Sequence, residues 1–374
     1  MTKKKIFFND LYSQNSIVES LFINDVKKIL KDSSFILGQY VEKFENDFSV
    51  FCKNKYAVGV SCGTDAIKLC IKVLEPDKKT LIITQANTFI ATAIAIKDAS
   101  SDSTMLLTDI DKFYQMDMSS LEDILHKNRN FYDKCIVVPV SMYGHTFDKD
   151  SLIKLKNKFS FEIVEDCSQS HGSQFSDGTL SGTVGICAAY SLYPGKNLGA
   201  IGDAGVTSTN SKRIYNKLKK LRNYGSSKKY IHDIFGYNTR LDSIQAAFLI
   251  HKLKYINKFN KKRNNIGVRY INEITSSSIK NFKNANYCSY NTFHVYPIRI
   301  NNRKKFINYL DSLNIQWNIH YPIPIEKTKP FLHYNFYNPN TRKIAKQIIS
   351  LPIHPFMEKS DIDYIIENNN HNHL

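Results

Sequence analysis

Between about residues 55 and 210, short β-rich runs alternate with segments of helical periodicity. The β-rich runs are KYAVGV, LIIT, TMLLTD, CIVVPV, FEIVED and ICAAYS, and the helical patterns between them are TDAIKLCIKVL, FIATAIAIKDA, SSLEDILHK and DSLIKLKNKF. This alternation predicts an α/β domain with a mostly parallel central sheet and helices on both faces. Because ligands of such sheets bind at the carboxyl ends of the strands, the residues just after each strand are the first functional candidates.

The rest of the chain predicts a smaller α+β domain, and we place the division at residue 250, giving domains 1–250 and 251–374. Helical periodicity over about 241–275 is long enough to link the two domains. The polar tail at 365–374 is expected to fray, with His371 and His373 solvated rather than bound to metal. The elements expected after the linking helix are a strand over 292–300, a helix over 303–314, a strand and a Pro-rich turn over 315–325, and a helix over 342–351.

The charge and the cysteines exclude several classes of protein. A formal net charge of +17 over 374 residues fits either an anionic partner or lysines scattered over a solvated surface. No zinc-finger, RRM or basic-zipper pattern occurs, so we expect no nucleic-acid partner. Seven cysteines without a CxxC pair indicate neither a disulfide framework nor a zinc site, and they fit a reducing cytoplasm. We expect no signal peptide and no membrane span, because no apolar run is long enough.

Two small-residue turns follow the first two strands. SCGTDA, residues 61–66, opens a helix whose first amides, with the Thr64 hydroxyl, would bind one phosphate. Equally, Thr64 or Asp65 would be an ordinary helix cap. QANTF places Phe89 at the start of the next helix. Its ring either stacks on a planar ligand or packs in the core, and core packing is favoured when the residue is considered in isolation.

A carboxylate follows the strand FEIV. EDCSQSHG, residues 165–172, places Asp166 at the carboxyl end of this strand beside apolar sequence. A buried carboxylate without a partner is costly, so Asp166 either caps a helix or faces a cationic group of a ligand. Gln169, three residues later, offers both a donor and an acceptor.

The stretch SLYPGKNLGAIGDAG, residues 191–205, holds one lysine, Lys196, among four glycines. It matches neither GxxxxGK[ST] nor GxGxxG, which excludes an ATP P-loop and a dinucleotide turn. A Schiff-base lysine and a glycine-rich hairpin with an exposed lysine remain. Taken together, a phosphate turn, an aromatic ring, a strand-end acid and a later lysine suit one cofactor, pyridoxal 5′-phosphate, which has a phosphate, a flat ring, a pyridine nitrogen and an aldehyde.

These residues resemble the DegT/DnrJ/EryC1/StrS family of sugar aminotransferases, which have the type I fold of pyridoxal-phosphate enzymes. The resemblance covers nearly the whole chain, from FILGQYVEKFENDFSVF to ISLPIHPFM. The matching motifs, in order, are GVSCGTDA, ANTFIATA, EDCSQSHG, SLYPGKNLGAIGDAG, LRNYGS, GYNTRLDSIQAA and HYPIPI.

The resemblance implies a role for each candidate. Lys196 resembles the lysine that binds the cofactor's aldehyde and shuttles a proton, and Asp166 resembles the acid that keeps the pyridine nitrogen protonated. Gln169 is similar to the residue near the cofactor's phenolic oxygen, and Phe89 would stack on the ring. The phosphate would be held by Gly63, Thr64, Asp65 and Ser191, and by Asn238 reaching from a neighbouring subunit, which implies a homodimer with shared active sites.

The resemblance also implies a reaction, the transfer of an amino group from L-glutamate to a nucleotide-linked keto sugar. The relatives that it most resembles aminate C3 of a dTDP-3-keto-6-deoxyhexose. The product would serve amino-sugar and surface-polysaccharide synthesis. The alternatives are C4 amination of a UDP- or dTDP-4-keto-6-deoxysugar, dehydration on the same fold, and a regulator that binds the cofactor without turnover. Relatives that dehydrate carry histidine in place of the lysine, so Lys196 favours transamination. Candidate sugar contacts are Tyr193, Tyr224, His320 and Tyr321, each of which could instead be packing. Glu326 departs from relatives, which often have histidine there.

Overall fold

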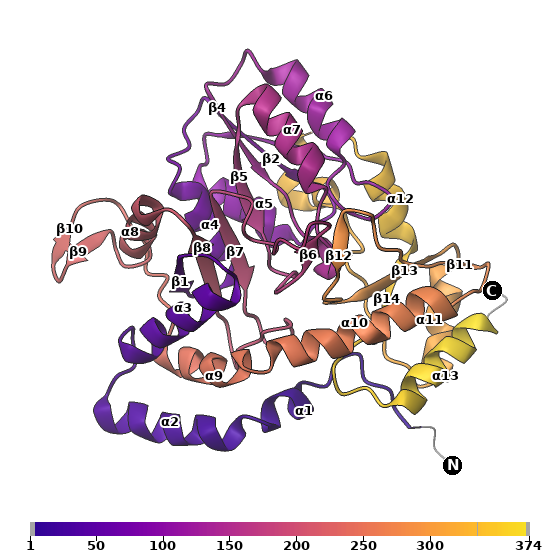
Figure 1. The fold of residues 1–374 in the computed structure, drawn as a ribbon. Helices are drawn as coiled ribbons and strands as arrows, with labels where there is room; N and C mark the ends of the chain where they lie inside the picture. Colours follow the sequence, from indigo (N-terminus) through magenta and orange to yellow (C-terminus); the bar gives the residue numbers. More distant parts are fainter. Residues whose placement is uncertain (1–3, 335, 372–374) are drawn as a thin grey trace.

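The computed structural model describes residues 4–334 and 336–371, and a seven-stranded sheet forms its centre (Figure 1). The strand order is β1-β8-β7-β5-β4-β2-β3. Only β8 runs antiparallel to its neighbours in this sheet, so the expected mostly parallel sheet is confirmed. The strands are β1 (Tyr56–Val60), β2 (Thr80–Gln85), β3 (Thr104–Thr108), β4 (Lys134–Val138), β5 (Glu162–Asp166), β7 (Cys187–Ser191) and β8 (Gly205–Thr209).

Helices cover both faces of the sheet because alternate strand residues point to opposite sides. In β5, Val164 belongs to the apolar cluster under one set of helices and Ile163 to the cluster under the other set. The first face is covered by α4 (Gly63–Lys72), α5 (Ile90–Ala99) and α8 (Lys212–Leu221). The second is covered by α3 (Gln39–Phe51), α6 (Met118–Asn128), α7 (Lys149–Phe159) and α9 (Ser243–Leu253).

The long helix α10 (Ile256–Glu273) leads from the sheet to the C-terminal part (Figure 1). There, a three-stranded antiparallel sheet in the order β11-β13-β14 packs with helices around its own apolar cluster. Its elements are β11 (Ile279–Lys280), β13 (Tyr296–Ile300), β14 (Ile348–Leu351), α11 (Arg303–Ser312), α12 (Pro339–Gln347) and α13 (Lys359–Asn370). The division at residue 250 stays a prediction.

Short elements complete the chain. Two helices precede the sheet, α1 (Leu11–Ser16) and α2 (Glu19–Asp32), and two small ribbons pair β6 (Gln174–Phe175) with β12 (Cys288–Tyr290) and β9 (Ser226–Lys228) with β10 (Ile231–His232). The 3₁₀ turns are η1 (Met142–Gly144), η2 (Ile325–Lys327) and η3 (Lys329–Tyr334). The N-terminal segment joins the C-terminal part through a bridge between Ile6 and Ile315.

Three C-terminal expectations are wrong. Residues 315–325 form no strand, because single bridges at Ile315 and Asn318 are followed by two prolines, which lack an N–H for a ladder. The expected helix over 342–351 ends at Gln347, and the β-branched run after it becomes β14. The tail is helical to Asn370, since Ile365 and Ile366 are buried; of the two histidines, His371 is exposed and His373 lies outside the described residues.

Candidate active site

A cavity of about 650 Å³ lies at the carboxyl ends of β1, β2, β5 and β7. This is the edge at which the sequence predicts ligand binding. The cavity walls also include residues from the N-terminal segment and from the C-terminal part. Of the predicted site residues, Gly63, Thr64, Phe89, Asp166, Gln169, Ser191, Tyr193, Lys196, His320 and Tyr321 all line it.

The start of α4 lies directly against the end of β7. A Cβ atom added to Gly63 would lie 2.5 Å from the Ser191 Cβ, so only glycine fits this approach. The helix is capped by Cys62, whose Sγ accepts from the Asp65 N–H at 3.4 Å, so the expectation of Thr64 or Asp65 as cap is wrong. Thr64 lines the cavity beside this helix start, where free backbone amides favour an anion.

Asp65 faces away from this wall. Its carboxylate forms an ion pair with Lys68 and accepts a hydrogen bond from Ser61, and it is absent from the cavity lining in the described part of the chain. A direct phosphate contact by Asp65 is therefore not supported, since a carboxylate that already has two partners gains nothing beside a second anion. Its position at the first turn of α4 fits a helix-stabilising role.

The carboxylate of Asp166 is buried at the end of β5 and already oriented. Oδ2 accepts from Thr92 Oγ1 at 2.8 Å and Oδ1 accepts from the Ser168 N–H at 3.1 Å. The side chain remains part of the cavity wall. An ionised carboxylate has about four acceptor positions, so two donors leave it able to accept from a cationic N–H of a ligand.

Lys196 lies on the hairpin loop between the antiparallel strands β7 and β8, but it is half-buried and lines the cavity, so the exposed lysine of the hairpin interpretation is wrong. Burial lowers the pKa of its amine from 10.5 to about 8, and the negative charge of Asp166 opposes this shift. Near neutral pH, the amine therefore loses its proton more readily than an exposed lysine does. A lysine of this kind suits covalent chemistry with an aldehyde.

Gln169, Tyr321 and Phe89 form a connected group on the cavity wall. Gln169 Oε1 accepts from the Tyr143 N–H at 2.7 Å, which leaves its Nε2 to donate to the Tyr321 hydroxyl at 3.1 Å. The Tyr321 ring packs on Phe89 with 5.4 Å between centroids. Phe89 is 53% exposed, so the interpretation of this residue as a core aromatic is wrong.

His320 and Tyr193 complete the predicted part of the wall. His320 Nδ1 lies 2.9 Å from Ser350 Oγ, its ring stacks on Phe8, and burial lowers its pKa to about 4, so it is neutral. Tyr193 is 58% exposed at the cavity. Both side chains can form hydrogen bonds with a polar ligand.

Comparison with known proteins identifies the family. The model of the DegT/DnrJ/EryC1/StrS aminotransferase family matches residues 16–369. The chain belongs to this family. It is therefore an aminotransferase, and the expected class of enzyme, the type I fold and the cofactor, pyridoxal 5′-phosphate, are confirmed.

Individual relatives align over almost the whole aminotransferase. It is 34% identical to the dTDP-3-amino-3,6-dideoxy-alpha-D-galactopyranose transaminase of Aneurinibacillus thermoaerophilus, over 96% of this chain and 97% of that protein. It is 30% identical to the UDP-N-acetyl-3-dehydro-alpha-D-glucosamine 3-aminotransferase of Acidithiobacillus ferrooxidans, over 94% of each chain. The crystal structure of Streptomyces venezuelae DesV in complex with a ketimine intermediate superposes with a TM-score of 0.91 at 28% identity, covering 98% of each chain.

Two predicted residues lie away from the cavity wall in the described part of the aminotransferase. Asn238 pairs with Asn223 through a β-bridge, and the Tyr224 N–H donates to the Tyr237 carbonyl at 2.8 Å. Tyr224 is therefore not part of this cavity wall, and its contact with a sugar stays a prediction. Both residues belong to the segment with the β9–β10 ribbon, which projects from the body at the left of Figure 1.

The sequence interpretation missed several wall residues. Phe8 and Asn9 come from the N-terminal segment, where no motif marks them, and Asn9 Nδ2 lies 3.5 Å from the Gly195 carbonyl. His294 comes from just before β13, and its Nδ1 lies 3.3 Å from Asn197 Oδ1. Asn197 follows Lys196 directly, but nothing in the local sequence indicates that its partner is His294.

Glu326 has a structural explanation. It lies buried in η2, where its carboxylate forms an ion pair with Arg342 and accepts from Asn338. The carboxylate therefore stabilises the turn that follows the cavity residues His320 and Tyr321. Glu326 itself is not among the residues that line the cavity.

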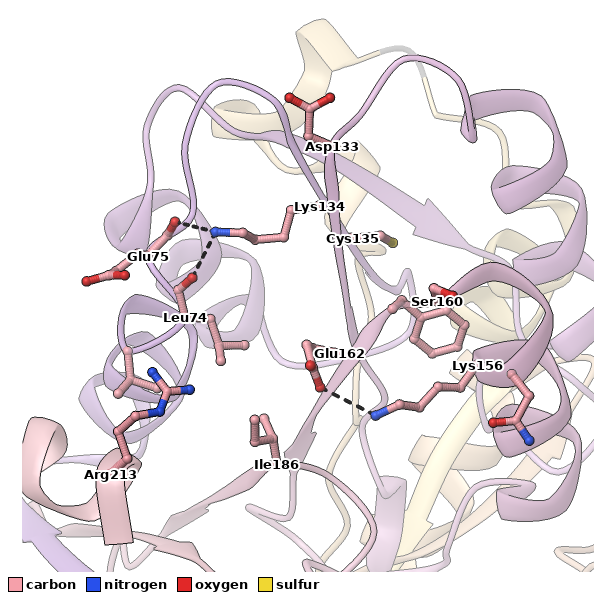
Figure 2. A pocket seen from close by; sticks show the side chains of 13 residues that line it. Leu74, Glu75, Asp133, Lys134, Cys135, Lys156, Ser160, Glu162, Ile186 and Arg213 are labelled. Atoms are coloured by element: carbon pink, nitrogen blue, oxygen red, sulfur yellow. Dashed lines mark hydrogen bonds and ion pairs between the residues drawn. The ribbon is translucent and has the colours of Figure 1, made fainter. Parts of the chain in front are cut away.

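A second hollow, of about 640 Å³, lies at the opposite edge of the sheet, near the starts of β4 and β5 (Figure 2). Its lysines already have partners: Lys134 Nζ donates to the carbonyl oxygens of Leu74 and Glu75, and Lys156 pairs with Glu162 at 3.4 Å. Catalytic ligands of such sheets bind at the carboxyl ends, so this hollow is not the active site.

The pKa of Lys196 predicts the pH dependence of its reactivity. In the cofactor-free protein, reductive methylation of Lys196 should rise with pH around a midpoint near 8, because only the neutral amine is a nucleophile and burial favours it. An ordinary lysine has a midpoint near 10.5. Peptide mass spectrometry after short reaction times measures both, with the exposed lysines as the internal control, and a common midpoint for Lys196 and these lysines would contradict the prediction.

The contact between Gly63 and Ser191 predicts the effect of one added methyl group. Gly63→Ala should weaken binding of pyridoxal 5′-phosphate by about tenfold or more, because the Cβ must push α4 away from β7. The matched control is Gly195→Ala, whose Cβ would meet only the Tyr193 ring at an ordinary 3.5 Å. Titration of the cofactor-free variants with pyridoxal 5′-phosphate measures both affinities. Equal losses in the two variants would show that the close contact between Gly63 and Ser191 does not determine cofactor binding.

Proposed function

We propose that this aminotransferase moves an amino group from L-glutamate to C3 of a dTDP-linked 3-keto-6-deoxyhexose. The observation that carries the proposal is the meeting of Lys196, Asp166 and the α4 start in one cavity at the carboxyl edge of the sheet. The relatives named for transamination of 3-amino or 3-keto nucleotide sugars, at 34% and 30% identity, support C3 as the position.

The residues of the cavity fit pyridoxal 5′-phosphate by their own chemistry. The cofactor, when bound, supplies an electron-withdrawing ring that stabilises negative charge at the carbon losing a proton. Gly63, Thr64 and Ser191 would hold its phosphate at the start of α4, where a Cβ at residue 63 would close the space. Asp166 would accept from its pyridine nitrogen, and Gln169 would orient its phenolic edge.

Lys196 performs the acid–base work in this proposal. Its amine, with a pKa of about 8, can hold the cofactor and can take and return the proton that moves during transfer. Phe89 and Tyr321 would cover one face of the ring, and Tyr193 and His320 would contact the sugar. Neutral His320 can accept a hydrogen bond from a hydroxyl group without adding charge.

The alternatives differ in the product. C4 amination of a UDP- or dTDP-4-keto-6-deoxysugar would use the same residues, whereas dehydration would need no amino donor. Lys196, in place of the histidine that the family resemblance associates with dehydration, favours transamination. A regulator without turnover is disfavoured by the presence of Lys196, Asp166 and Gln169 in one cavity.

A substrate panel tests the proposal. The purified holoenzyme is incubated with L-glutamate and each of the dTDP- and UDP-linked 3-keto and 4-keto 6-deoxysugars, and the products are identified by mass spectrometry and NMR. We expect an amino group at C3 of the dTDP-3-keto sugars and equimolar 2-oxoglutarate. A C4 amine, a deoxygenated product formed without glutamate, or no turnover of any sugar would each overturn the proposed reaction.

We propose further that the enzyme is a homodimer with shared active sites. The projecting segment carries exposed apolar side chains that monomers rarely display together, Tyr230 at 83% and Phe235 at 100% exposure, near Asn238 and Tyr224. In a dimer, this segment would bring Asn238 and Tyr224 of one subunit to the cavity of the other. The enzyme would act in the cytoplasm, and its product would serve the synthesis of amino sugars for a surface polysaccharide. Within the described residues, no helix is long and apolar enough to cross a membrane.

Subunit mixing tests the shared site. Lys196→Ala and Asn238→Asp subunits, each of low activity alone, should regain activity when unfolded and refolded together, because one of the two cavities then has both native residues. Sedimentation should give twice the chain mass of 43.1 kDa. No gain on mixing, or a monomer at assay concentration, would contradict the arrangement.

A further inference from the structure

Two threonines at the start of α5 connect to the buried acid of the active site. Thr92 Oγ1 lies 2.8 Å from Asp166 Oδ2, and Thr88 Oγ1 lies 3.0 Å from Thr92 Oγ1. All three side chains are buried, with 4%, 1% and 3% exposure for Thr88, Thr92 and Asp166. The acid is thus linked to a chain of two buried hydroxyl groups.

The direction of this chain is fixed by the acid. An ionised carboxylate only accepts, so the Thr92 hydroxyl must give its proton to Asp166. The Thr92 oxygen is then free to accept from the Thr88 hydroxyl. Hydroxyl groups arranged in this order polarise one another, so the outer threonine strengthens the bond that the inner one makes.

The threonines do not serve the helix instead. The N-cap of α5 is Phe89, and no side chain among the described residues caps this helix. Threonines at a helix start commonly bond the free amides, and here both hydroxyl groups turn to each other and to Asp166. Their orientation therefore needs a reason outside helix formation, and the acid supplies one.

We propose that Thr92, oriented by Thr88, is a positioning residue that holds Asp166 toward the cofactor's pyridine nitrogen and stabilises its negative charge there. The inference rests on the proposed role of Asp166. The same helical turn carries Phe89, so ring stacking and placement of the acid are set by one short segment.

Four other titratable groups lie near Asp166. Lys196 and Tyr321 face it across the cavity, Cys167 follows it in the chain, and Cys70 approaches from α4. None of the four donates to Asp166 in the described structure. A change at Thr92 therefore removes the only side-chain hydroxyl that the described residues offer to this carboxylate.

The test compares Thr92→Val, which keeps the shape, with Thr92→Ser, which keeps the hydroxyl. We expect Thr92→Val to weaken pyridoxal 5′-phosphate binding about tenfold, since hydrogen bonds to charged groups are the strong ones. Thr92→Ser should restore most of the affinity. Thr88→Val should also lower the affinity for pyridoxal 5′-phosphate, but by less than Thr92→Val.

A second readout separates positioning from general loosening. Without the Thr92 donor, the Asp166 carboxylate is no longer held toward the pyridine nitrogen, so this nitrogen would keep its proton less firmly and the ring would withdraw fewer electrons. The pH midpoint of the bound cofactor's visible absorption should then rise in Thr92→Val and return in Thr92→Ser. Thermal unfolding of the cofactor-free variants reports any loss of folding on its own.

The outcomes distinguish a failure of the positioning role of Thr92 from a failure of the proposed function. Wild-type affinity and midpoint in Thr92→Val would overturn the positioning role, as would equal losses in the valine and serine variants. Asp166→Ala is the reference: if it bound cofactor like the wild type, the proposed function itself would fail. Weak binding in Asp166→Ala with normal binding in Thr92→Val overturns the positioning role alone.

Discussion

Replacing Lys196 with alanine should lower turnover by roughly 10⁴-fold or more, because one side chain supplies both the nucleophile and the proton carrier. The amine is half-buried beside Asp166, and its pKa of about 8 makes it the readily deprotonated base of the cavity. Single-turnover formation of 2-oxoglutarate from L-glutamate measures the loss without interference from product release. The cofactor should also wash out of the variant, since no covalent link remains.

Two controls make this result specific. Lys127→Ala removes an exposed lysine at the end of α6 and should leave turnover unchanged. Thermal unfolding of Lys196→Ala without cofactor should match that of the cofactor-free wild type, because the amine makes no ion pair in the described structure. Turnover near that of the wild type would refute the role of Lys196 and, with it, the proposed function.

Replacing Arg222 with methionine should lower the free energy of unfolding by about 3–5 kcal/mol, since it leaves a buried carboxylate without its partner. Arg222 pairs with Glu45 of α3, and both are buried. The pair encloses Gly59 of β1, whose N–H donates to Glu45 at 2.8 Å and whose carbonyl accepts from Arg222 at 2.7 Å. Denaturant unfolding followed by fluorescence measures the change.

The control is an ion pair that stays accessible to solvent. Arg269 is partly exposed and binds both Glu273, one helical turn away at 2.6 Å, and Asp363 of α13 at 2.8 Å, and Arg269→Met should cost about 1 kcal/mol or less. The double variant Glu45→Met with Arg222→Met should recover part of the loss, because no lone charge is then buried. Equal costs for Arg222→Met and Arg269→Met would show that the buried pair contributes no more than a surface one.

The topology of the sheet explains why much of the site could be predicted. Parallel strands bring their carboxyl ends to one edge, so residues that follow different strands meet although they are far apart in sequence. Phe89 after β2, Asp166 at the end of β5 and Ser191 at the end of β7 follow this rule. The alternation of strand and helix also predicted α4, α5, α6 and α7, whereas α3 and α8 were missed and α9 was expected to be part of a linking helix.

Other parts of the site depend on packing that no local pattern records. Phe8 reaches the cavity through contacts with Gln316 and His320 of the C-terminal part, and Asn9 lies beside the Gly195 carbonyl. His294 precedes a strand of the smaller sheet. Cys62 caps α4 with sulfur, which cap preferences for oxygen side chains do not anticipate. The residues after Gln347 form β14 because Ile348 and Ile349 pair with β13, a partner distant in sequence.

The N-terminal segment has a practical consequence for handling the protein. Phe8, Asn9 and Leu11 are part of the cavity wall, and the Phe8 N–H donates to Gln316 Oε1 at 2.8 Å. Trimming the first dozen residues would therefore act as an active-site mutation rather than as removal of an inert end. An affinity tag is better placed after the C-terminal helix, and a loss of activity in an N-terminally trimmed preparation should not be attributed to misfolding alone.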